Sequence, residues 1–443
     1  MDEIVYVAQV RDCQTGEIKN TQEIYSKVIS KPTDFDQFGL RHKEQIELIR
    51  TAQDFYLAEQ VDLHLDDSTC PNCHQKAPRK GKFTSDFHDV FTDHKITLSR
   101  FMCTCGWQSA FTINKLYGKA MHPELAKLQA SIGAKMSFGQ STIHLNTLCA
   151  NERKVNNRGT VQQTVNRVGQ ALEPYKKSER WSESTEETDT LIVCTDGGHV
   201  QDYTKDKHSF EEMISTCYNL SKRTVDDNGK ATISERISVA SAKYDKQATI
   251  KKLTTNACKR LGMTSNTYVV GLTDGAKNCW SIITALEKEC AQLERILDWF
   301  HIGKKYKERE SKIPVELREL YAKSKWHLWH GKPKTALLRL EQLYDQLELV
   351  ESKQKLKQLM TYIKNNQTMI VNYRRRQKAK LPYSSQLAET SVNSVINERQ
   401  KNKKMQWSRH GAHNILQIGT SLFSKTWEQD WRAIQSTLYH QAA

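Results

Sequence analysis

The chain has 443 residues, of which 38% are hydrophobic and 26% are charged, and its net charge is +15. This length exceeds one compact core and indicates about three domains. No run of 18 apolar residues occurs, which argues against a membrane-spanning helix. Residues 1–5 lack the basic flank and apolar core of a signal peptide, and seven of the eleven cysteines are scattered singly. Because scattered cysteines suit a reducing compartment, we expect a cytoplasmic protein.

The excess positive charge lies in one quarter of the chain. Residues 300–410 hold 25 Lys and Arg against 10 Asp and Glu, a surplus of +15 that equals the net charge of the whole chain. Charge concentrated in this way is typical of a surface that binds a polyanion, most often nucleic acid. A solvated helical face would explain a single lysine cluster, but the localised imbalance favours a nucleic-acid partner.

The first predicted elements are a hairpin and a helix, in a domain over residues 1–65. Residues 4–29 alternate weakly in polarity around a turn segment that ends in Gly16, as in a β-hairpin. Apolar residues at 42–61 recur close to helical spacing. Neither element contains a recognisable chemical motif.

Two close cysteine pairs mark the next domain, residues 66–112. Cys70 and Cys73 form the first pair, and Cys103 and Cys105 form the second. A strand-rich stretch separates them, so the pairs can lie on two turns and offer four thiolates to one zinc ion. Gly106 lets the backbone amides turn back toward the sulfurs. We expect a zinc ribbon with one structural Zn²⁺, because four thiolates leave no open coordination position.

Residues 113–180 predict a helical region. Two helices are expected near 123–130 and 141–148, and a third begins with Thr160 as N-cap. The third would carry one apolar face formed by Val161, Val165, Val168 and Leu172. Short helices joined by tight turns are compatible with a helix-turn-helix reader of DNA. A small helical bundle that links two domains fits this pattern equally well.

The stretch 191–199 introduces the first candidate site. An apolar run leads into Asp196, Gly197, Gly198 and His199, which predicts a buried strand that ends in a tight turn. An acid at the end of a buried strand costs free energy unless it is paired. A plain Asp-Gly turn is the alternative, but the pattern Thr-Asp-Gly recurs at Asp274. His199 has no assigned role.

Between residues 213 and 302 the predicted elements are both strands and helices, and from residue 303 they are helices. In chain order we expect strands at 213–220 and 235–244, helices at 246–262 and 280–293, and a strand at 295–302. Asn228 and Gly229 mark the turn of a hairpin between the first two strands. Residues 303–384 predict a basic helical insertion that closes at Pro382. A last helix, from about Ser385, carries Glu389 within a final segment 385–443.

This order matches an α/β multidomain chain with an RNase H-like core, whose first part is 186–302. In that topology the first and fourth strands are parallel neighbours, which brings Asp196 and Asp274 together. Glu389 shares a helix face with the apolar residues at i+3 and i+7, so it points toward the sheet. Three converging carboxylates hold hard divalent cations. We expect two Mg²⁺ or Mn²⁺ ions that activate a phosphodiester.

At these residues the chain resembles the DDE-type insertion-sequence transposases, and most closely the ISKra group. The resemblance is strong over residues 190–418 and looser in the N-terminal part. The segments that carry it begin at Thr195, Thr273, Leu297, Leu328, Glu389 and Met405. One departure is Ile418-Gly419-Thr420, where the family pattern has Leu-Arg, so the resemblance does not imply a phosphate contact there.

The resemblance implies that Asp196, Asp274 and Glu389 are the catalytic triad of a transposase. Such an enzyme cuts DNA at transposon ends and joins the freed 3′-OH to target DNA, and it belongs to a mobile element. Asp298 and His301 match a supporting Asp-x-x-His pair, whereas a hydrogen bond that fixes the next helix explains them equally well. The resemblance also implies a homo-oligomer on DNA, in a bacterial cytoplasm near the nucleoid.

Basic and aromatic side chains are candidates for DNA contact. The candidates are Arg374, Arg375, Arg376, Lys403, Lys404, Trp407 and Arg409. Tryptophan can stack on unpaired bases; among Trp299, Trp326, Trp329 and Trp407, we favour Trp407 for stacking and core packing for most of the others. Two other functions stay open: a non-catalytic DNA-binding protein derived from a transposase, and a simple RNase H-like nuclease.

Overall fold

The computed structural model describes residues 1–64, 68–184, 186–204, 208–227, 229–384 and 386–439. The fold is mixed α/β, about half helical, with a mixed central sheet. None of the helices in these ranges combines the length and the apolar character needed to cross a membrane. The chain divides into two compact units, Met1–Arg167 with Trp431–Ala443, and Val168–Asp430.

The first unit joins two antiparallel hairpins to a set of helices. Its elements are β1 (Glu3–Arg11), β2 (Ile18–Val28), α1 (His42–His64), β3 (Arg79–His88), β4 (Asp93–Phe101), α2 (Ile113–Tyr117), α3 (Pro123–Lys135) and α4 (Phe138–Leu148). The boundaries with the second unit fall within α5 (Arg158–Lys177) and α16 (Trp427–Leu438). The expected N-terminal hairpin and the helix after it are both present.

The apolar face predicted for the third helix is confirmed. Val161, Val165, Val168 and Leu172 are all 0% exposed on α5. The expected N-cap is wrong, because the helix begins two residues before Thr160. The side chain of Asn157 accepts a hydrogen bond from the Thr160 amide at 3.0 Å, so Asn157 satisfies a free amide of the first turn.

His94, which lies between the two cysteine pairs in sequence, is a buried histidine. Its side chain is 1% exposed, with Nδ1 2.5 Å from an Asp54 oxygen and Nε2 3.0 Å from an Asp89 oxygen. Burial opposes the charged imidazole, but hydrogen bonds to Asp89 and Asp54 raise the pKa of His94 above its ordinary value. Because Asp54 lies on α1, the pair ties this helix to β4.

The second unit is organised on one sheet, in the order β11-β10-β5-β6-β9, with β12 beside β5. The strands are β5 (Thr190–Asp202), β6 (Ser209–Asn219), β9 (Ile237–Ser241), β10 (Tyr268–Thr273), β11 (Gln292–Leu297) and β12 (Gln406–Trp407). β10 is parallel to both β5 and β11, and β6 is antiparallel to its neighbours β5 and β9. A small hairpin, β7 (Arg223–Val225) and β8 (Ala231–Ile233), stands apart.

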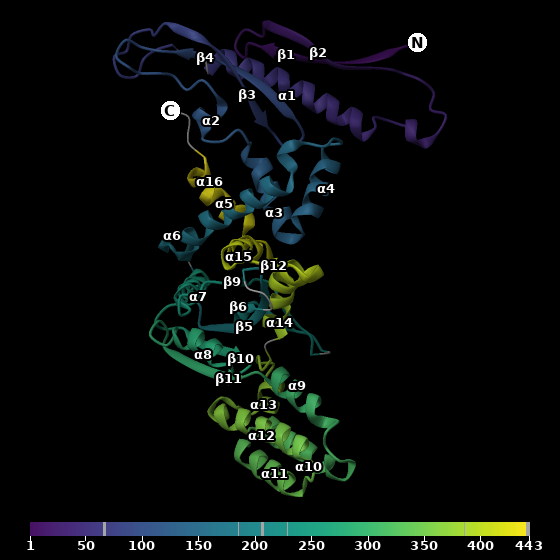
Figure 1. Cartoon of the computed structure of the whole chain (residues 1–443), viewed down its shortest axis with the longest axis vertical. Coiled ribbons are helices and arrows are strands. Elements are labelled where there is room, and N and C mark those ends of the chain that lie inside the picture. Colours follow the sequence, from purple (N-terminus) through teal and green to yellow (C-terminus); the bar gives the residue numbers. More distant parts are fainter. Residues whose placement is uncertain (65–67, 185, 205–207, 228, 385, 440–443) are drawn as a thin grey trace. The chain divides into compact units, whose positions relative to one another are not determined.

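Helices cover both faces of this sheet. The helices are α6 (Glu179–Ser182), α7 (Ala248–Arg260), α8 (Lys277–Thr284), α9 (Trp299–Glu310), α10 (Arg318–Trp329), α11 (Pro333–Gln346), α12 (Val350–Asn365), α13 (Tyr373–Lys378), α14 (Gln386–Ser391), the π-helix η6 (Val392–Lys401) and α15 (Arg409–Phe423). One core cluster joins alternate sheet residues such as Ile192 and Cys194 to the helices after β11. The other joins Leu191 and Val193 to α7 and α8. Figure 1 shows α9 to α13 gathered as one helical body, as expected for residues 303–384.

Four local predictions are corrected by the structure. β5 does not end at Asp196 but continues through both glycines to Asp202. The helix expected at 280–293 is α8 (Lys277–Thr284), and the strand expected at 295–302 is β11, which ends at Leu297. Between the strands expected at 213–220 and 235–244, the structure adds the separate hairpin β7–β8. Asn228, its predicted turn residue, and Ser385 lie outside the described residues.

Candidate active site and metal centre

Three aspartates lie at one level across three neighbouring strands. Thr195 of β5 is in register with Thr273 of β10, which is in register with Leu297 of β11. The next residue on each strand path is an acid: Asp196, Asp274 and Asp298. Parallel pairing therefore brings together residues that are 78 and 24 positions apart in sequence, counted from these numbers.

Asp196 and its strand neighbours share one face of the sheet. Since alternate strand residues face the same side, Cys194, Asp196 and Gly198 lie together. Thr216, opposite Cys194, has its hydroxyl oxygen 2.8 Å from that of Ser391 at the end of α14. A Cβ on Gly198 would lie 3.1 Å from a methyl carbon of Ile396 in η6. The helix that carries Glu389 thus packs against β5 and β6, on the Asp196 face.

This close approach explains one of the two glycines after Asp196. Gly198 has no positive φ, so it is not needed for a turn. A side chain there would press on Ile396 and Val392. Gly275 does serve a turn, with φ +95°, and a Cβ there would come within 3.0 Å of the Asn366 amide group.

The Asp196 carboxylate is in an unfavourable electrostatic position. Burial raises its pKa above the ordinary value, and the charges of Asp274 and Asp298 raise it further. The Gly197 amide donates a hydrogen bond to Asp196 at 2.7 Å and, with the charge of His301, lowers the pKa in part. A bound divalent cation would offset the repulsion among these acids.

Asp298 and His301 form an internal hydrogen-bonded pair. Asp298 is 0% exposed; one oxygen accepts from the Phe300 amide at 2.9 Å, and the other lies 2.6 Å from Nδ1 of His301. Burial works against the charged imidazole, but Asp298 and then Asp196 and Asp274 raise the pKa of His301 above its ordinary value. Asp298 is also the N-cap of α9, which matches the helix-fixing reading of this pair.

Glu389 lies on a helix over the sheet and is more exposed than Asp196 and Asp274. Its helix covers the Asp196 face, but its own side chain is exposed. In the described part of the chain, Asp196, Asp274 and Glu389 do not bring three ligand oxygens within 4.8 Å of one another. The charges of Asp274 and Asp298, but no contribution from Glu389, are among those that shift the pKa of Asp196 most. Among the described residues, the three aspartates also do not bring three ligand oxygens within 4.8 Å of one another.

The helical insertion contributes residues that the sequence did not reveal. The Tyr362 hydroxyl, on α12, donates to the backbone carbonyl of Asp274 at 2.8 Å. Asn366 follows one turn later, and its side chain accepts from the Trp280 indole at 3.1 Å. These contacts fix the Asp274 turn from a segment 88 residues away. No local sequence pattern predicts a hydrogen bond between segments so far apart.

Some of the predicted DNA-contact side chains are exposed, and others bond to neighbouring residues of the chain. Arg374, Arg375 and Lys404 are exposed. Arg376 pairs with Glu294 at 2.9 Å, and Arg409 donates to the Ala242 carbonyl at 3.0 Å. The side chain of Lys403 lies outside the described residues.

The tryptophans also separate by burial. Trp407 is only 8% exposed, and its indole donates to the Gln400 carbonyl at 3.0 Å. Trp326 is 52% exposed, with its ring centre 3.9 Å from that of His330. His330 in turn lies 3.2 Å from a guanidinium nitrogen of Arg374. Trp326, rather than Trp407, therefore presents an exposed indole, and Arg374 contacts its neighbour His330.

The four cysteines form a group that can bind a metal such as zinc. Their sulfurs, on Cys70, Cys73, Cys103 and Cys105, all lie within 4.8 Å of one another. The pairs Cys70–Cys105 and Cys73–Cys103 are each 3.4 Å apart. Thiolates at 2.3 Å from a tetrahedral zinc are about 3.8 Å apart, so the arrangement is close to the required one.

The thiols shift one another's pKa values through hydrogen bonds. A hydrogen bond from the Cys105 amide, followed by contacts with Cys73 and Cys105, lowers the pKa of Cys103 to about 6. The Gln75 amide acts in the same direction on Cys73, but its contacts with Cys103 and Cys70 prevail and raise the pKa of Cys73 to about 12. Protons held between neighbouring sulfurs are those that a metal displaces.

Comparison with known proteins adds no relative to these observations. No protein-family profile matches the chain, and no curated protein matches it.

Proposed function

We propose that the protein is a DDE-type transposase of the ISKra kind, which cuts DNA at transposon ends and joins the 3′-OH to target DNA. The observation that carries the proposal is the alignment of Asp196 and Asp274 at one level of adjacent parallel strands, with the Glu389 helix packed over the Asp196 face. Carboxylates on adjacent strands, with a further acid on a covering helix, can provide the oxygen ligands that two-metal phosphoryl transfer uses.

The sheet supports an RNase H-like core within this proposal. In chain order, leaving out the separate β7–β8 hairpin, the five main strands lie in the order 3-2-1-4-5, and only the second is antiparallel to the first. The first and fourth strands are thus the neighbours that hold Asp196 and Asp274. The all-helical segment after β11 then interrupts the core before α14.

Each acidic residue has a distinct role in the proposed reaction. Asp196 and Asp274 provide carboxylate oxygens for a divalent cation, and Glu389 completes the set from α14. Two Mg²⁺ ions, when bound, would activate the attacking oxygen and stabilise the leaving oxygen. Asp298 acts as a positioning residue, since it orients His301 through the 2.6 Å contact and caps α9.

The other parts of the chain suit a DNA partner. The four-cysteine group would hold one structural Zn²⁺ as a zinc ribbon, together with the hairpin β3–β4 between the cysteine pairs. The region with α3, α4 and α5 would read the terminal repeats. The positive surplus of residues 300–410, with Arg374 and Trp326 exposed, would contact the phosphates and unpaired bases of the ends.

Strand transfer by the purified chain tests the proposal. Asp196→Asn and Asp274→Asn should each reduce Mg²⁺-dependent joining of labelled transposon-end DNA by about 10³-fold or more. Asp189→Asn, an exposed acid just before β5, is the matched control and should retain activity. Joining that persists in Asp196→Asn would refute the catalytic assignment, and cut products without joined products would indicate a nuclease.

A second candidate is a DNA-binding protein that derives from a transposase but lacks catalysis. The exposed position of Glu389, apart from the two aspartates, favours it. The wild-type chain would then bind DNA without forming cut or joined products, whatever divalent cation is supplied.

A further inference from the structure

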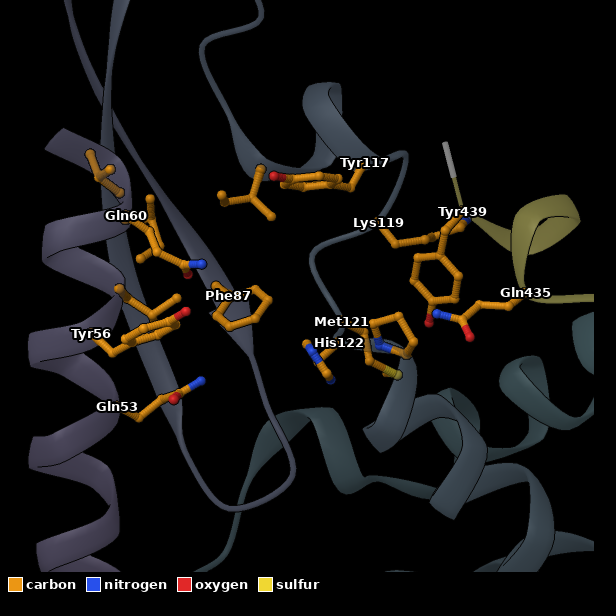
Figure 2. Close-up of a pocket in the computed structure, with 15 residues that line it drawn as sticks. Gln53, Tyr56, Gln60, Phe87, Tyr117, Lys119, Met121, His122, Gln435 and Tyr439 are labelled. Atoms are coloured by element: carbon orange, nitrogen blue, oxygen red, sulfur yellow. The ribbon is translucent and has the colours of Figure 1, made fainter. Parts of the chain in front are cut away.

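A cavity of about 500 Å³ lies inside the unit Met1–Arg167 with Trp431–Ala443. Its walls come from α1, β3, β4, α2, the segment that leads into α3, and the end of α16. Figure 2 shows Tyr56 and Gln60 on one side, Gln435 and Tyr439 on the other, and Phe87 between them. This volume falls in the range of about 300–1,000 Å³ that small-ligand pockets occupy.

Aromatic rings dominate the walls. Tyr56, Phe87, Tyr117 and Tyr439 all line the cavity, and they come from four different elements or their ends. The Phe87 ring meets the His122 ring edge to face, with centres 6.1 Å apart. Figure 2 shows the Tyr56 and Tyr117 hydroxyls directed toward the cavity. Such walls accept a flat ring system.

The polar side chains that line the cavity favour some flat ligands over others. Gln53, Gln60 and Gln435 offer amide donors and acceptors, which can pair with both edges of a heterocyclic base. Lys119 is the one cation among the described lining residues, and these include no carboxylate. A positively charged ligand would find no counter-ion here, whereas a ligand with a phosphate would find Lys119.

His122 adds a fixed donor. Its Nδ1 accepts from the Glu124 amide at 3.2 Å, so the proton of the neutral ring is on Nε2. Burial lowers the pKa of His122 below its ordinary value, which keeps the ring neutral near pH 7.

Tyr439 provides an independent sign of a missing partner. It is 9% exposed, and in the described part of the chain its hydroxyl has no partner with regular hydrogen-bond geometry, although the Arg167 side chain interacts with it. The Arg167 guanidinium lies 5.7 Å from the centre of the ring and approaches the aromatic face. A buried hydroxyl whose hydrogen bond is poorly aligned costs free energy, which a polar ligand in the cavity would recover.

We propose that this cavity binds a nucleobase together with its phosphate, and that the base is an unpaired one from DNA. The base would stack on the tyrosine rings, its edge would pair with the glutamine amides, and Lys119 would contact the phosphate. The choice of DNA rests on the proposed function, whereas the base-and-phosphate chemistry rests on the cavity alone.

The test measures binding by the full-length chain, without any catalytic readout. One probe is a duplex with a single unpaired 2-aminopurine, the second is the same duplex with an abasic site, and the third is adenosine monophosphate. We expect quenched 2-aminopurine fluorescence and about tenfold tighter binding than to the abasic duplex. Quenching with the duplex supports the proposal. Binding of the mononucleotide alone supports a base-and-phosphate site but overturns DNA as the source of the base.

Matched variants make the result specific to the cavity. Tyr117→Leu should abolish the quenching and the tenfold preference, and Tyr117→Phe should retain both. Tyr56→Ala, which removes a ring that is 59% exposed, should weaken both with little loss of packing. Tyr244→Ala, 91% exposed in the other unit, is the surface control.

Equal binding of the unpaired-base and abasic duplexes, with no response to the mononucleotide, would overturn the proposal. If Asp196→Asn loses strand transfer but keeps the quenching, base binding in this cavity is independent of the catalytic residue. An inactive wild-type chain that still binds the base would refute the transposase alone.

Discussion

At the scale of single residues, buried carboxyls on β6 and β5 set the character of the proposed active-site face. Glu212 is 0% exposed and lies opposite Gly198, on the face of Asp196. One of its oxygens accepts from Gln400 at 3.1 Å, and the other has no hydrogen-bond partner among the described residues. Burial raises the pKa of Glu212 to about 8, against the hydrogen bond from Gln400 and the charges of Lys401 and Arg409.

This pKa predicts a pH-dependent stability. The folded state holds the Glu212 proton more tightly than the unfolded chain, whose glutamate pKa is about 4.3. The stabilisation is therefore complete below pH 4.3 and is lost as the pH rises through 8. Glu212→Gln should remove the decrease in stability at high pH. At pH 9 the variant should have a larger free energy of unfolding than the wild type, and at pH 5 the two values should be nearly equal.

Urea unfolding at pH 5, 7 and 9 measures the difference. Glu316→Gln, which changes an exposed carboxyl, should follow the wild type at each pH. If Glu212→Gln also follows the wild type at pH 9, Glu212 is not a buried proton acceptor in the folded chain.

At the scale of elements, glycines report how closely helices approach the sheet. Gly271 lies within β10, between Val193 of β5 and Arg295 of β11. A Cβ there would overlap the side chain of Ile283 at the end of α8. Gly303, in the interior of α9, has open space at the same position. The two glycines thus differ in their surroundings although both lie inside regular elements.

Alanine substitution should act in opposite directions at these two glycines. Gly271→Ala forces α8 away from β10 and should lower the free energy of unfolding by about 1–3 kcal/mol. Gly303→Ala adds a helix-favouring residue without a clash and should raise it by about 0.5–1 kcal/mol. Denaturant titrations of both variants check the signs. A loss of stability of similar size in both would contradict the packing seen at β10.

At the scale of the whole molecule, the chain has two compact units with different means of stabilisation. The unit Val168–Asp430 contains the central sheet and both large core clusters. The unit Met1–Arg167 with Trp431–Ala443 contains buried side chains of α3 to α5, such as Leu125 and Val165, and a separate small cluster of Ile96, Leu98 and Ile113. The four cysteines flank the hairpin β3–β4, which carries part of that small cluster. A segment with so small a cluster depends more on a bound metal than one with a large core.

Metal removal should therefore destabilise one unit selectively. We expect about one zinc per purified chain and two thermal transitions in calorimetry. A strong chelator should lower the transition of the cysteine-containing unit and leave the other unchanged. Cys73→Ser should reproduce the effect without a chelator, and Cys13→Ser, an exposed isolated thiol, should not. A zinc content well below one per chain would exclude the metal site.

The sequence alone determined the features that local pattern encodes. The apolar runs before Asp196 and Asp274 predicted two strands, and the structure has both. The 3.6-residue spacing from Val161 to Leu172 predicted a buried helix face, because periodicity alone decides which side chains share a face. Cysteine spacing predicted the thiol group for the same local reason.

Tertiary structure decided everything that depends on distant neighbours. β5 continues past Asp196 because β6 pairs with it through Gly197 and Gly198, and η6 needs the second glycine for space. Trp407 and Glu212 became buried, and Glu389 remained exposed, according to what packs above each of them. Burial and carboxylate distances arise from contacts between segments far apart in the chain, and a sequence read in local windows does not contain those contacts.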